Sequence, residues 1–336
     1  MKIMIDAMGG DNAPLEIVKG ACLASEKYKS KLVLVGDKPK IEACMKQLDA
    51  DTRIIDIVHT DVQITMEDDP LTVVRSKKDS SMAVGLNLLK DDGDAFVSAG
   101  NTGALHVGSS LIVRTIKGVQ RSGIATIMPF EKPVLMMDSG ANVNVTADYL
   151  VQWALMGQIY MKNVMGVDAP TVGLLNNGAE EHKGTQIEID AYQKLKNDPN
   201  IKFVGNIEGK ELPSAPCDVL VTDGFTGNIT LKLIEGLSKY FFGYMKTMYT
   251  QNIVTKMSYL AMKDQLRGMK HKFDSSEYGG APLLGLRKPV IKAHGSSDAK
   301  AIMNAVRQAE AFIKTGVIGE ITTALEAMKE NGATAN

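Results

Sequence analysis

Short, continuously apolar runs recur along the chain, and each one ends in a glycine-containing polar loop that leads into a helical pattern. An apolar run without alternation is typical of a strand buried on both faces, as in a parallel sheet covered by helices. The repeated order of strand, loop and helix therefore predicts an α/β protein, a three-layer α/β/α fold with a mostly parallel sheet. The predicted strands are Lys2–Asp6, Lys31–Gly36, Arg53–His59, Asp94–Ser98, Gly123–Pro129, Pro133–Asp138, Pro170–Leu175, Ile201–Gly205, Asp218–Thr222 and Pro289–Ala293.

The domain organisation follows from the absence of linkers. A length of 336 residues corresponds to about two average domains, yet the sequence has no Pro- or Ser-rich stretch and no low-complexity segment. Helices fill the gaps between the strands, as the capping-box pattern of Thr185 and Glu188 illustrates. We predict one interleaved unit over residues 1–330, an amphipathic helical segment projecting from it over 250–275, and a frayed tail over 331–336.

Charge and cysteine content exclude several classes of protein. The formal net charge of -1 argues against nucleic-acid binding, which needs a basic excess. No apolar run approaches the ~18 residues that span a bilayer, and the start at Met1–Asp6 has no signal-peptide pattern. Cys22, Cys44 and Cys217 are odd in number and scattered, as expected for reduced thiols. We expect a cytoplasmic location.

The loops that follow the strands are the expected place for a ligand, since open α/β sheets bind ligands at the carboxyl ends of their strands. The first loop holds Asp6 and Asp11 around the pair Gly9 and Gly10. Glycines allow a substrate to approach the backbone closely. A tight strand-to-helix turn with no ligand has the same composition, so both interpretations stay open for this loop alone.

Two further loops share the pattern Gly-x-Thr-Gly, each after an apolar strand and before a helix. Backbone N–H groups at a helix start, together with Asn and Thr side chains, form an anion site. The repetition favours a site for phosphate or carboxylate. The candidate residues are Gly100, Asn101, Thr102, Gly103, Asp223, Thr226, Gly227 and Asn228.

Three more strand-end loops carry groups that suit an anionic substrate. One holds Asp138 and Asn142, and another holds Lys183, two residues before a helix start. The last holds His294 and Ser296, with His294 as a general acid or an anion contact. A solvated lysine and a structural histidine are the corresponding alternatives without function.

Several common catalytic motifs are absent from the sequence. It has no G-x-G-x-x-G or P-loop pattern, no G-x-S-x-G nucleophile elbow, and no His or Cys pairs with metal-ligand spacing. We therefore expect no cofactor and no metal. The pattern indicates an anionic substrate held by backbone and small polar groups, without an obvious covalent nucleophile.

At this point the residues resemble a known family. Asp6–Asp11 with Pro14 is similar to the amino-terminal signature of bacterial acyl-ACP:phosphate acyltransferases, the PlsX-type phosphate acyltransferases, and the similarity runs the length of the chain. Each motif is modestly specific, but their common order is very specific. The other matching motifs are Arg75–Met82, Ser98–Ala104, Asp138–Asn142, Asn176–Gly184, Val204–Gly209, Thr222–Asn228, Gly279–Gly285 and His294–Ser297.

The resemblance implies an enzyme that reversibly forms acyl phosphate from a fatty acyl-ACP thioester and inorganic phosphate, feeding glycerol-3-phosphate acylation in phospholipid synthesis. It also implies a homodimer with a fold like those of isocitrate and isopropylmalate dehydrogenases and phosphotransacetylases. Because phosphate is already a nucleophile at neutral pH, the enzyme has to align it with the thioester and stabilise the oxyanion.

The residues then take the following expected roles. Asn101, Thr102, Thr226 and Asn228 hold phosphate, while Asp138, Asn142 and Asp223 orient these groups. Lys183 is the first choice for neutralising the phosphate or the oxyanion, and His294 is the second, at the leaving sulfur. Gly279 and Gly280 belong to the substrate-binding set together with the glycines, Asp6, Asp11 and Ser296 named above.

The segment from Ile253 to Phe273 differs from the rest of the chain. Its apolar residues fall on two helical faces, which predicts two helices or a kink near Lys263. Five cations stand against one acid, a local excess of four positive charges. The segment suits either a helix pair at a dimer interface or a surface that contacts anionic lipid or an acidic carrier protein. The predicted surface residues are Met257, Leu260, Met262, Lys263, Leu266, Arg267 and Lys270.

The resemblance favours membrane docking there, at the inner face of the membrane, directly or through the glycerol-3-phosphate acyltransferase. Three alternatives remain beside the main prediction. A phosphotransacetylase-like enzyme would use acyl-CoA and would not need the basic segment. A dehydrogenase of the isocitrate type is the weaker rival, because fold likeness does not determine chemistry. A non-catalytic acyl-carrier or membrane binding module is disfavoured by the many polar strand-end loops.

Overall fold

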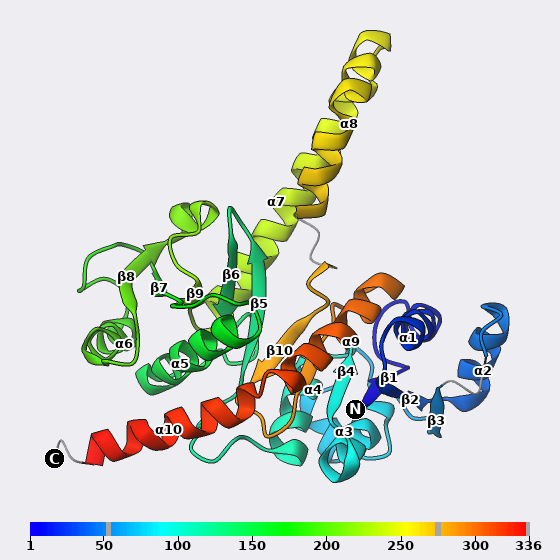
Figure 1. Cartoon of the computed structure of the whole chain (residues 1–336), viewed down its shortest axis with the longest axis horizontal. Coiled ribbons are helices and arrows are strands. Elements are labelled where there is room, and N and C mark those ends of the chain that lie inside the picture. The colour runs from blue at the N-terminus through cyan, green and yellow to red at the C-terminus, as the bar shows by residue number, and fades with distance from the viewer. Residues whose placement is uncertain (52–54, 273–276, 334–336) are drawn as a thin grey trace.

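The computed structural model describes residues 1–51, 55–272 and 277–333. Within them, one 11-stranded sheet has the order β3-β2-β1-β4-β11-β10-β5-β6-β9-β7-β8, with helices on both faces (Figure 1). The strands are β1 Lys2–Asp6, β2 Lys31–Gly36, β3 Asp56–His59, β4 Ala95–Ser98, β5 Gly123–Pro129, β6 Pro133–Met137, β7 Val172–Asn176, β8 Phe203–Glu208, β9 Val219–Val221, β10 Ala281–Leu284 and β11 Val290–Lys292. The predicted α/β/α class is confirmed.

The helices cover the sheet according to the alternation of side chains in the strands. In β1, Ile3 and Ile5 pack in the core shared with α1 and α9, whereas Met4 points to the opposite core, under α3 and α4. The helices are α1 Leu15–Lys27, α2 Lys38–Gln47, α3 Ser81–Asp92, α4 Thr102–Gly108, α5 Ala147–Asn163, α6 Gln186–Asn197, α7 Gly224–Thr250, α8 Ile253–Lys272, α9 Ala299–Lys314 and α10 Val317–Ala333, with short helical turns η1 Pro70–Val74, η2 Ser109–Val113 and η3 Gly209–Ser214.

The sheet is mostly parallel, as predicted, but its direction reverses in the middle. Strands β1, β2, β3, β4 and β11 run one way, and β6, β7, β8 and β9 run the other way. The reversal comes from three antiparallel ladders in a row, β11 with β10, β10 with β5, and β5 with β6. The polar loops that follow β1, β4 and β11 therefore lie at one edge of the sheet, and those that follow β6, β7 and β9 lie at the opposite edge.

The boundaries of several strands differ from the prediction. The motif Gly279–Gly285 contains β10, a strand that the sequence analysis missed because it is only four residues long and flanked by glycines. Strand β8 begins at Phe203 rather than Ile201 and runs on to Glu208. The predicted start at Arg53 falls in residues 52–54, outside the described part of the chain.

Helices α7 and α8 form a hairpin that projects from the body of the protein (Figure 1). The prediction of two helices or a kink near Lys263 is corrected: α8 is one continuous helix from Ile253 to Lys272. The two apolar faces of this helix have different surroundings. Met262 contacts Tyr249 of α7 and Leu266 is half-buried, whereas Met257 and Leu260 on the other face are exposed. Phe273 lies outside the described residues.

At the C-terminus, α10 continues to Ala333, so the predicted tail begins inside the last turns of this helix. Residues 334–336 lie outside the described part of the chain. None of the described helices combines the length and the apolar character that crossing a membrane requires.

Candidate active site

The first group of polar residues lies at the carboxyl ends of β1, β4 and β11. Asp6, the last residue of β1, is buried and accepts hydrogen bonds from the hydroxyls of Ser81 at 2.6 Å and Ser98 at 2.7 Å. Burial raises the pKa of Asp6, and these hydrogen bonds oppose the rise. Asp6 thus joins β1 to the end of β4 and to the first turn of α3.

Close backbone packing explains the glycines of this group. A Cβ at Gly9 would lie 2.8 Å from the amide nitrogen of Gly100, and Gly10 has a φ of 110°. The amide of Asp11 donates to the carbonyl of Gly295 at 2.8 Å, which joins the first loop to the loop after β11. The structure therefore brings these predicted residues together, although they are about 90 and 280 residues apart in sequence.

The predicted glycines at the start of β10 have different neighbours. A Cβ at Gly280 would lie 2.8 Å from the carbonyl oxygen of Lys292, so Gly280 belongs to this edge. A Cβ at Gly279 would meet the backbone of Asn304 at 2.3 Å. Gly279 thus allows the chain to pass close to α9 and packs against that helix.

Lys292 is the residue of this group that sequence analysis missed. It ends β11, only 9% of it is exposed, and its ammonium donates to the carbonyls of Ala99, at 3.4 Å, and Ala293. Burial lowers the pKa of Lys292 to about 8, and the charges of Asp11 and Asp6 oppose this effect. The available signal was a lysine at the end of an otherwise apolar strand, two residues before His294.

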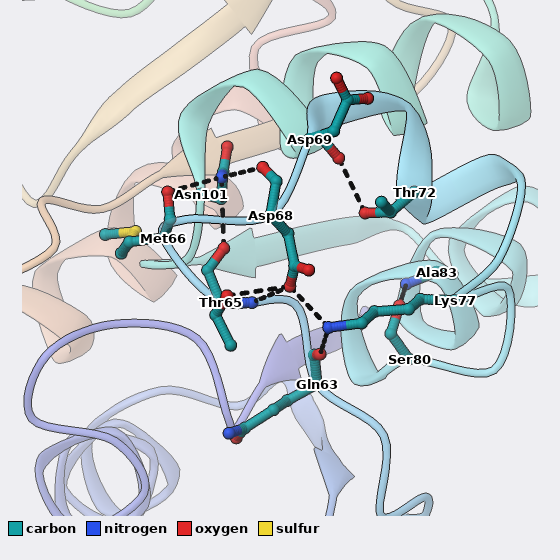
Figure 2. Close-up of polar contacts among 10 residues, drawn as sticks. All are labelled: Gln63, Thr65, Met66, Asp68, Asp69, Thr72, Lys77, Ser80, Ala83 and Asn101. Carbon is teal, nitrogen blue, oxygen red and sulfur yellow. Dashed lines mark hydrogen bonds and ion pairs between the residues drawn. The ribbon is translucent and has the colours of Figure 1, made fainter.

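Asn101 has a structural role in this group (Figure 2). Its amide oxygen accepts from the amide of Ala104, which caps α4, and its nitrogen lies 3.2 Å from the carbonyls of Thr65, Met66 and Asp68. Lys77 holds the same loop through an ion pair of 2.6 Å with Asp68. The side chain expected to hold phosphate is thus already bonded to the backbone.

The remaining predicted residues of this edge are more accessible. Thr102 and Gly103 begin α4, and a Cβ at Gly103 would lie 2.7 Å from the ring of Pro70. His294 is exposed, and its Nδ1 accepts from the amide of Ser296 at 3.2 Å and lies 2.8 Å from the Ser296 hydroxyl. A ring whose Nδ1 accepts carries its proton on Nε2 when neutral.

The second group lies at the opposite edge, around Asp138 at the end of β6. Asp138 is fully buried, has a φ of 38°, and accepts from the amides of Ala141 at 2.9 Å and Asn142 at 2.8 Å. Burial raises the pKa of Asp138, and these hydrogen bonds oppose the rise. The side-chain nitrogen of Asn142 donates to the carboxylate of Asp138 and to the carbonyl of Ser122, each at 2.9 Å.

The start of α7 is docked onto this loop. Asp223 caps the helix by accepting from the amides of Phe225 at 2.8 Å and Thr226 at 2.9 Å. The side chain of Asn228 donates to the carbonyl of Ser139 at 3.1 Å. A Cβ at Gly227 would lie 2.1 Å from the carbonyl oxygen of Asp138, so only glycine permits this approach.

Lys183 lies in the loop after β7, at the same edge. Two hydrogen bonds hold the loop. The side-chain nitrogen of Asn176 donates to the carbonyl of Lys183 at 3.0 Å, and the backbone amide of Lys183 donates to the carbonyl of Glu180 at 3.1 Å. The lysine side chain passes over Gly178 and is half-buried. Among the described residues, its ammonium has no hydrogen-bond or ion-pair partner.

Helix α4 connects the two groups. Asn101 caps its start in the first group, and the Nε2 of His106 near its end lies 3.1 Å from the carbonyl of Ser122, which also bonds Asn142 of the second group. A helix of seven residues is ~10 Å long. The two groups are thus linked through one short helix and the carbonyl of Ser122. The described residues contain no cluster of three or more His, Cys, Asp or Glu suited to a metal ion.

Solved structures of other enzymes have a similar fold. A phosphotransacetylase from Streptococcus pyogenes is similar with a TM-score of 0.64 at 18% identity, over 93% of this chain and 94% of that one. A 4-hydroxythreonine-4-phosphate dehydrogenase from Klebsiella pneumoniae has a TM-score of 0.53 at 11% identity, over 93% and 99% of the two chains. At these identities the likeness shows the fold alone.

Sequence relatives are much more similar. A phosphate acyltransferase from Alkaliphilus oremlandii is 44% identical over 333 residues, covering 98% of this chain and 99% of the relative. One from Lysinibacillus sphaericus is 45% identical over 327 residues, covering 96% and 97%. The family model described as "Fatty acid synthesis protein" matches residues 1–320. The chain therefore belongs to this fatty acid synthesis protein family of phosphate acyltransferases and is an acyltransferase enzyme.

Proposed function

We propose that the enzyme transfers a fatty acyl group from an acyl-ACP thioester to inorganic phosphate, and that the acyl phosphate feeds phospholipid synthesis. The observation that carries this proposal is the pair of polar groups at opposite ends of α4. Two separated sites suit two substrates, a small anion and a long thioester. Family membership supports the same reaction class.

In the proposed step, a phosphate oxygen forms a bond to the thioester carbonyl carbon and the carbon–sulfur bond breaks. The thiolate leaves readily, because a simple thiol has a pKa near ~8.5, and it takes up a proton from solvent or from a nearby acid such as His294. Lys183, whose ammonium is unpaired among the described residues, neutralises the oxyanion. The loops after β6 and β9 are positioned by Asp138, Asn142 and Asp223. At the other edge, Asn101 positions the loop that contains Thr65, Met66 and Asp68.

The deciding experiment incubates purified enzyme with acyl-ACP and phosphate, without any other cofactor, and detects acyl phosphate as hydroxamate. We expect product from acyl-ACP and much less from acyl-CoA at equal concentration. A preference for acyl-CoA would instead favour the phosphotransacetylase-like reaction. The absence of product from either thioester, from protein shown to be folded, would contradict the proposal.

We further propose a cytoplasmic homodimer that docks peripherally on the inner face of the membrane. The exposed face of α7 carries Leu233, Leu237 and Phe241, each about 58% exposed, a large apolar surface for a lone helix. We assign this face to a second copy of the chain, which the mass in solution tests. We assign the exposed face of α8, with Met257 and Leu260, to anionic lipid, directly or through a partner acyltransferase.

The basic residues of α8 support this assignment. Lys263 and Arg267 lie exposed on the helix, next to the apolar face, as in helices that bind anionic surfaces. Lys270 also lies in α8, but its side chain is outside the described part of the structure. The homodimer and the lipid contact use different helices, so they can be tested separately.

We expect Leu260→Glu to release the protein from vesicles of anionic lipid, because a charge replaces a side chain that is 66% exposed on the proposed lipid face. Flotation of wild type and variant with the same vesicles measures this, and turnover of soluble acyl-ACP should persist. Leu111→Glu, which changes a leucine that is 58% exposed outside the hairpin, is the matched control. Equal flotation of the Leu260 variant and wild type would remove the lipid assignment.

A further inference from the structure

The ammonium of Lys292 is a buried cation, and the two acids whose charges act on it, Asp6 and Asp11, form no ion pair with it. Its two acceptors are neutral backbone carbonyls, those of Ala99 and Ala293. It forms no ion pair with a described carboxylate. Asp6, the buried one of these two acids, already accepts hydrogen bonds from Ser81 and Ser98. Burying an ammonium without an ion-pair partner is costly, and fold stability alone gives no reason to keep one.

The surroundings of Lys292 allow a ligand to supply the missing charge. The ammonium has three donors, and two of them point at the carbonyls at the ends of β4 and β11. The adjoining loops bring Gly9, Gly10 and Gly100 together in close backbone packing, while Gly295 and Ser296, in the loop directly after Lys292, are half-buried and exposed, respectively. These loops were singled out by sequence as substrate loops, and the exposed His294 is two residues away.

We propose that Lys292 binds a phosphate group of a substrate at the edge formed by β1, β4 and β11, and is a catalytic residue of the acyltransferase. This inference rests on the proposed function for the identity of the ligand. The phosphate group has two possible sources, the inorganic phosphate or a phosphoester within the thioester substrate.

The charge of Lys292 also predicts a pH dependence. The charged groups that face it are Asp6 from β1 and Asp11 from the following loop, and His294 in its own loop is exposed. With a folded-state pKa of about 8, the ammonium loses its proton as the pH rises through 8. Phosphate binding should therefore weaken steadily above pH 8, and bound phosphate should delay the loss by stabilising the charge.

The test compares wild type with Lys292→Met, which keeps the length of the side chain and removes the charge. In the first arm, thermal unfolding is followed with increasing inorganic phosphate. In the second arm, the KM values for phosphate and acyl-ACP are measured. We expect the variant to lose the phosphate-induced rise in Tm, or to raise one KM at least tenfold, while Lys292→Arg restores part of the effect. Lys19→Met, an exposed lysine on α1, is the control.

The outcomes distinguish the two sources of the phosphate group, and they distinguish the Lys292 site from the proposed function. Loss of the Tm response with a raised KM for phosphate identifies inorganic phosphate, and a raised KM for acyl-ACP alone identifies a phosphoester of that substrate. No change in either arm overturns the inference, as do KM values of wild type for phosphate and for acyl-ACP that both stay constant from pH 7 to 10. If wild type binds phosphate through Lys292 but makes no acyl phosphate, the proposed function fails and the phosphate site stands. Should the variants not fold, the pH dependence of the two KM values of wild type decides.

Discussion

Replacing Gly227 by alanine is expected to lower the free energy of unfolding by about 3 kcal/mol, at the upper end of what overpacking costs. The added Cβ would lie 2.1 Å from the carbonyl oxygen of Asp138, and a backbone atom cannot rotate away. Helix α7 would have to lift from the loop at Asp138–Asn142. We therefore also expect acyl transfer to fall, because Asp223, Thr226 and Asn228 move with the helix start. Urea unfolding and turnover measure the two effects.

The same helix offers a matched control. A Cβ at Gly236 would meet nothing within 4 Å, so Gly236→Ala adds helix propensity without a clash. We expect it to stabilise the protein by about 0.5–1 kcal/mol. If both substitutions had the same sign and size, the close docking of α7 on the loop after β6 would be wrong.

Removing the charge of Lys183 should reduce kcat/KM by about 100-fold, the size that loss of one oxyanion stabiliser usually has. Lys183→Ala removes an ammonium that has no partner among the described residues, so stability should change by less than ~0.5 kcal/mol. A large loss of rate without a loss of stability is what separates a functional lysine from a structural one. Steady-state kinetics and urea unfolding of the same preparation provide both values.

Lys202→Ala serves as the control, because Lys202 is an exposed lysine just before β8, at the opposite end of the strands from Lys183. Its kcat/KM should stay within a factor of two of wild type. A loss of less than tenfold for Lys183→Ala, with the fold intact, would remove Lys183 from the oxyanion and leave His294 as the remaining candidate from sequence.

Much of the site was accessible from sequence because it lies in loops of unusual composition. Asp6, Gly9, Gly10, Asp11 and Gly100 were predicted, and they do meet at one edge of the sheet. Local composition did not reveal what each side chain contacts. A helix cap and a candidate ligand use the same residue types, and only the structure shows that the side chains of Asn101 and Asp223 cap helices.

Lys292 illustrates the opposite case. The sequence alone does not mark it as a site residue, because a lysine at a strand end is usually exposed. Its burial depends on neighbours from β4 and from the loop after β1, about 190 and 280 residues away in sequence. No pattern within a short window contains that information.

By itself the sequence determined the α/β/α class, the position of most strands and the loops that carry polar residues. These properties depend on local periodicity and on glycine, which act over a few residues. Only the tertiary structure decided that the loops divide between two edges of the sheet, because this depends on the order and direction in which distant strands pair. Strand β10, four residues long, inserts antiparallel between β11 and β5. That pairing, with the hairpin of β5 and β6, reverses half of the sheet and places Lys183 and Lys292 on opposite edges.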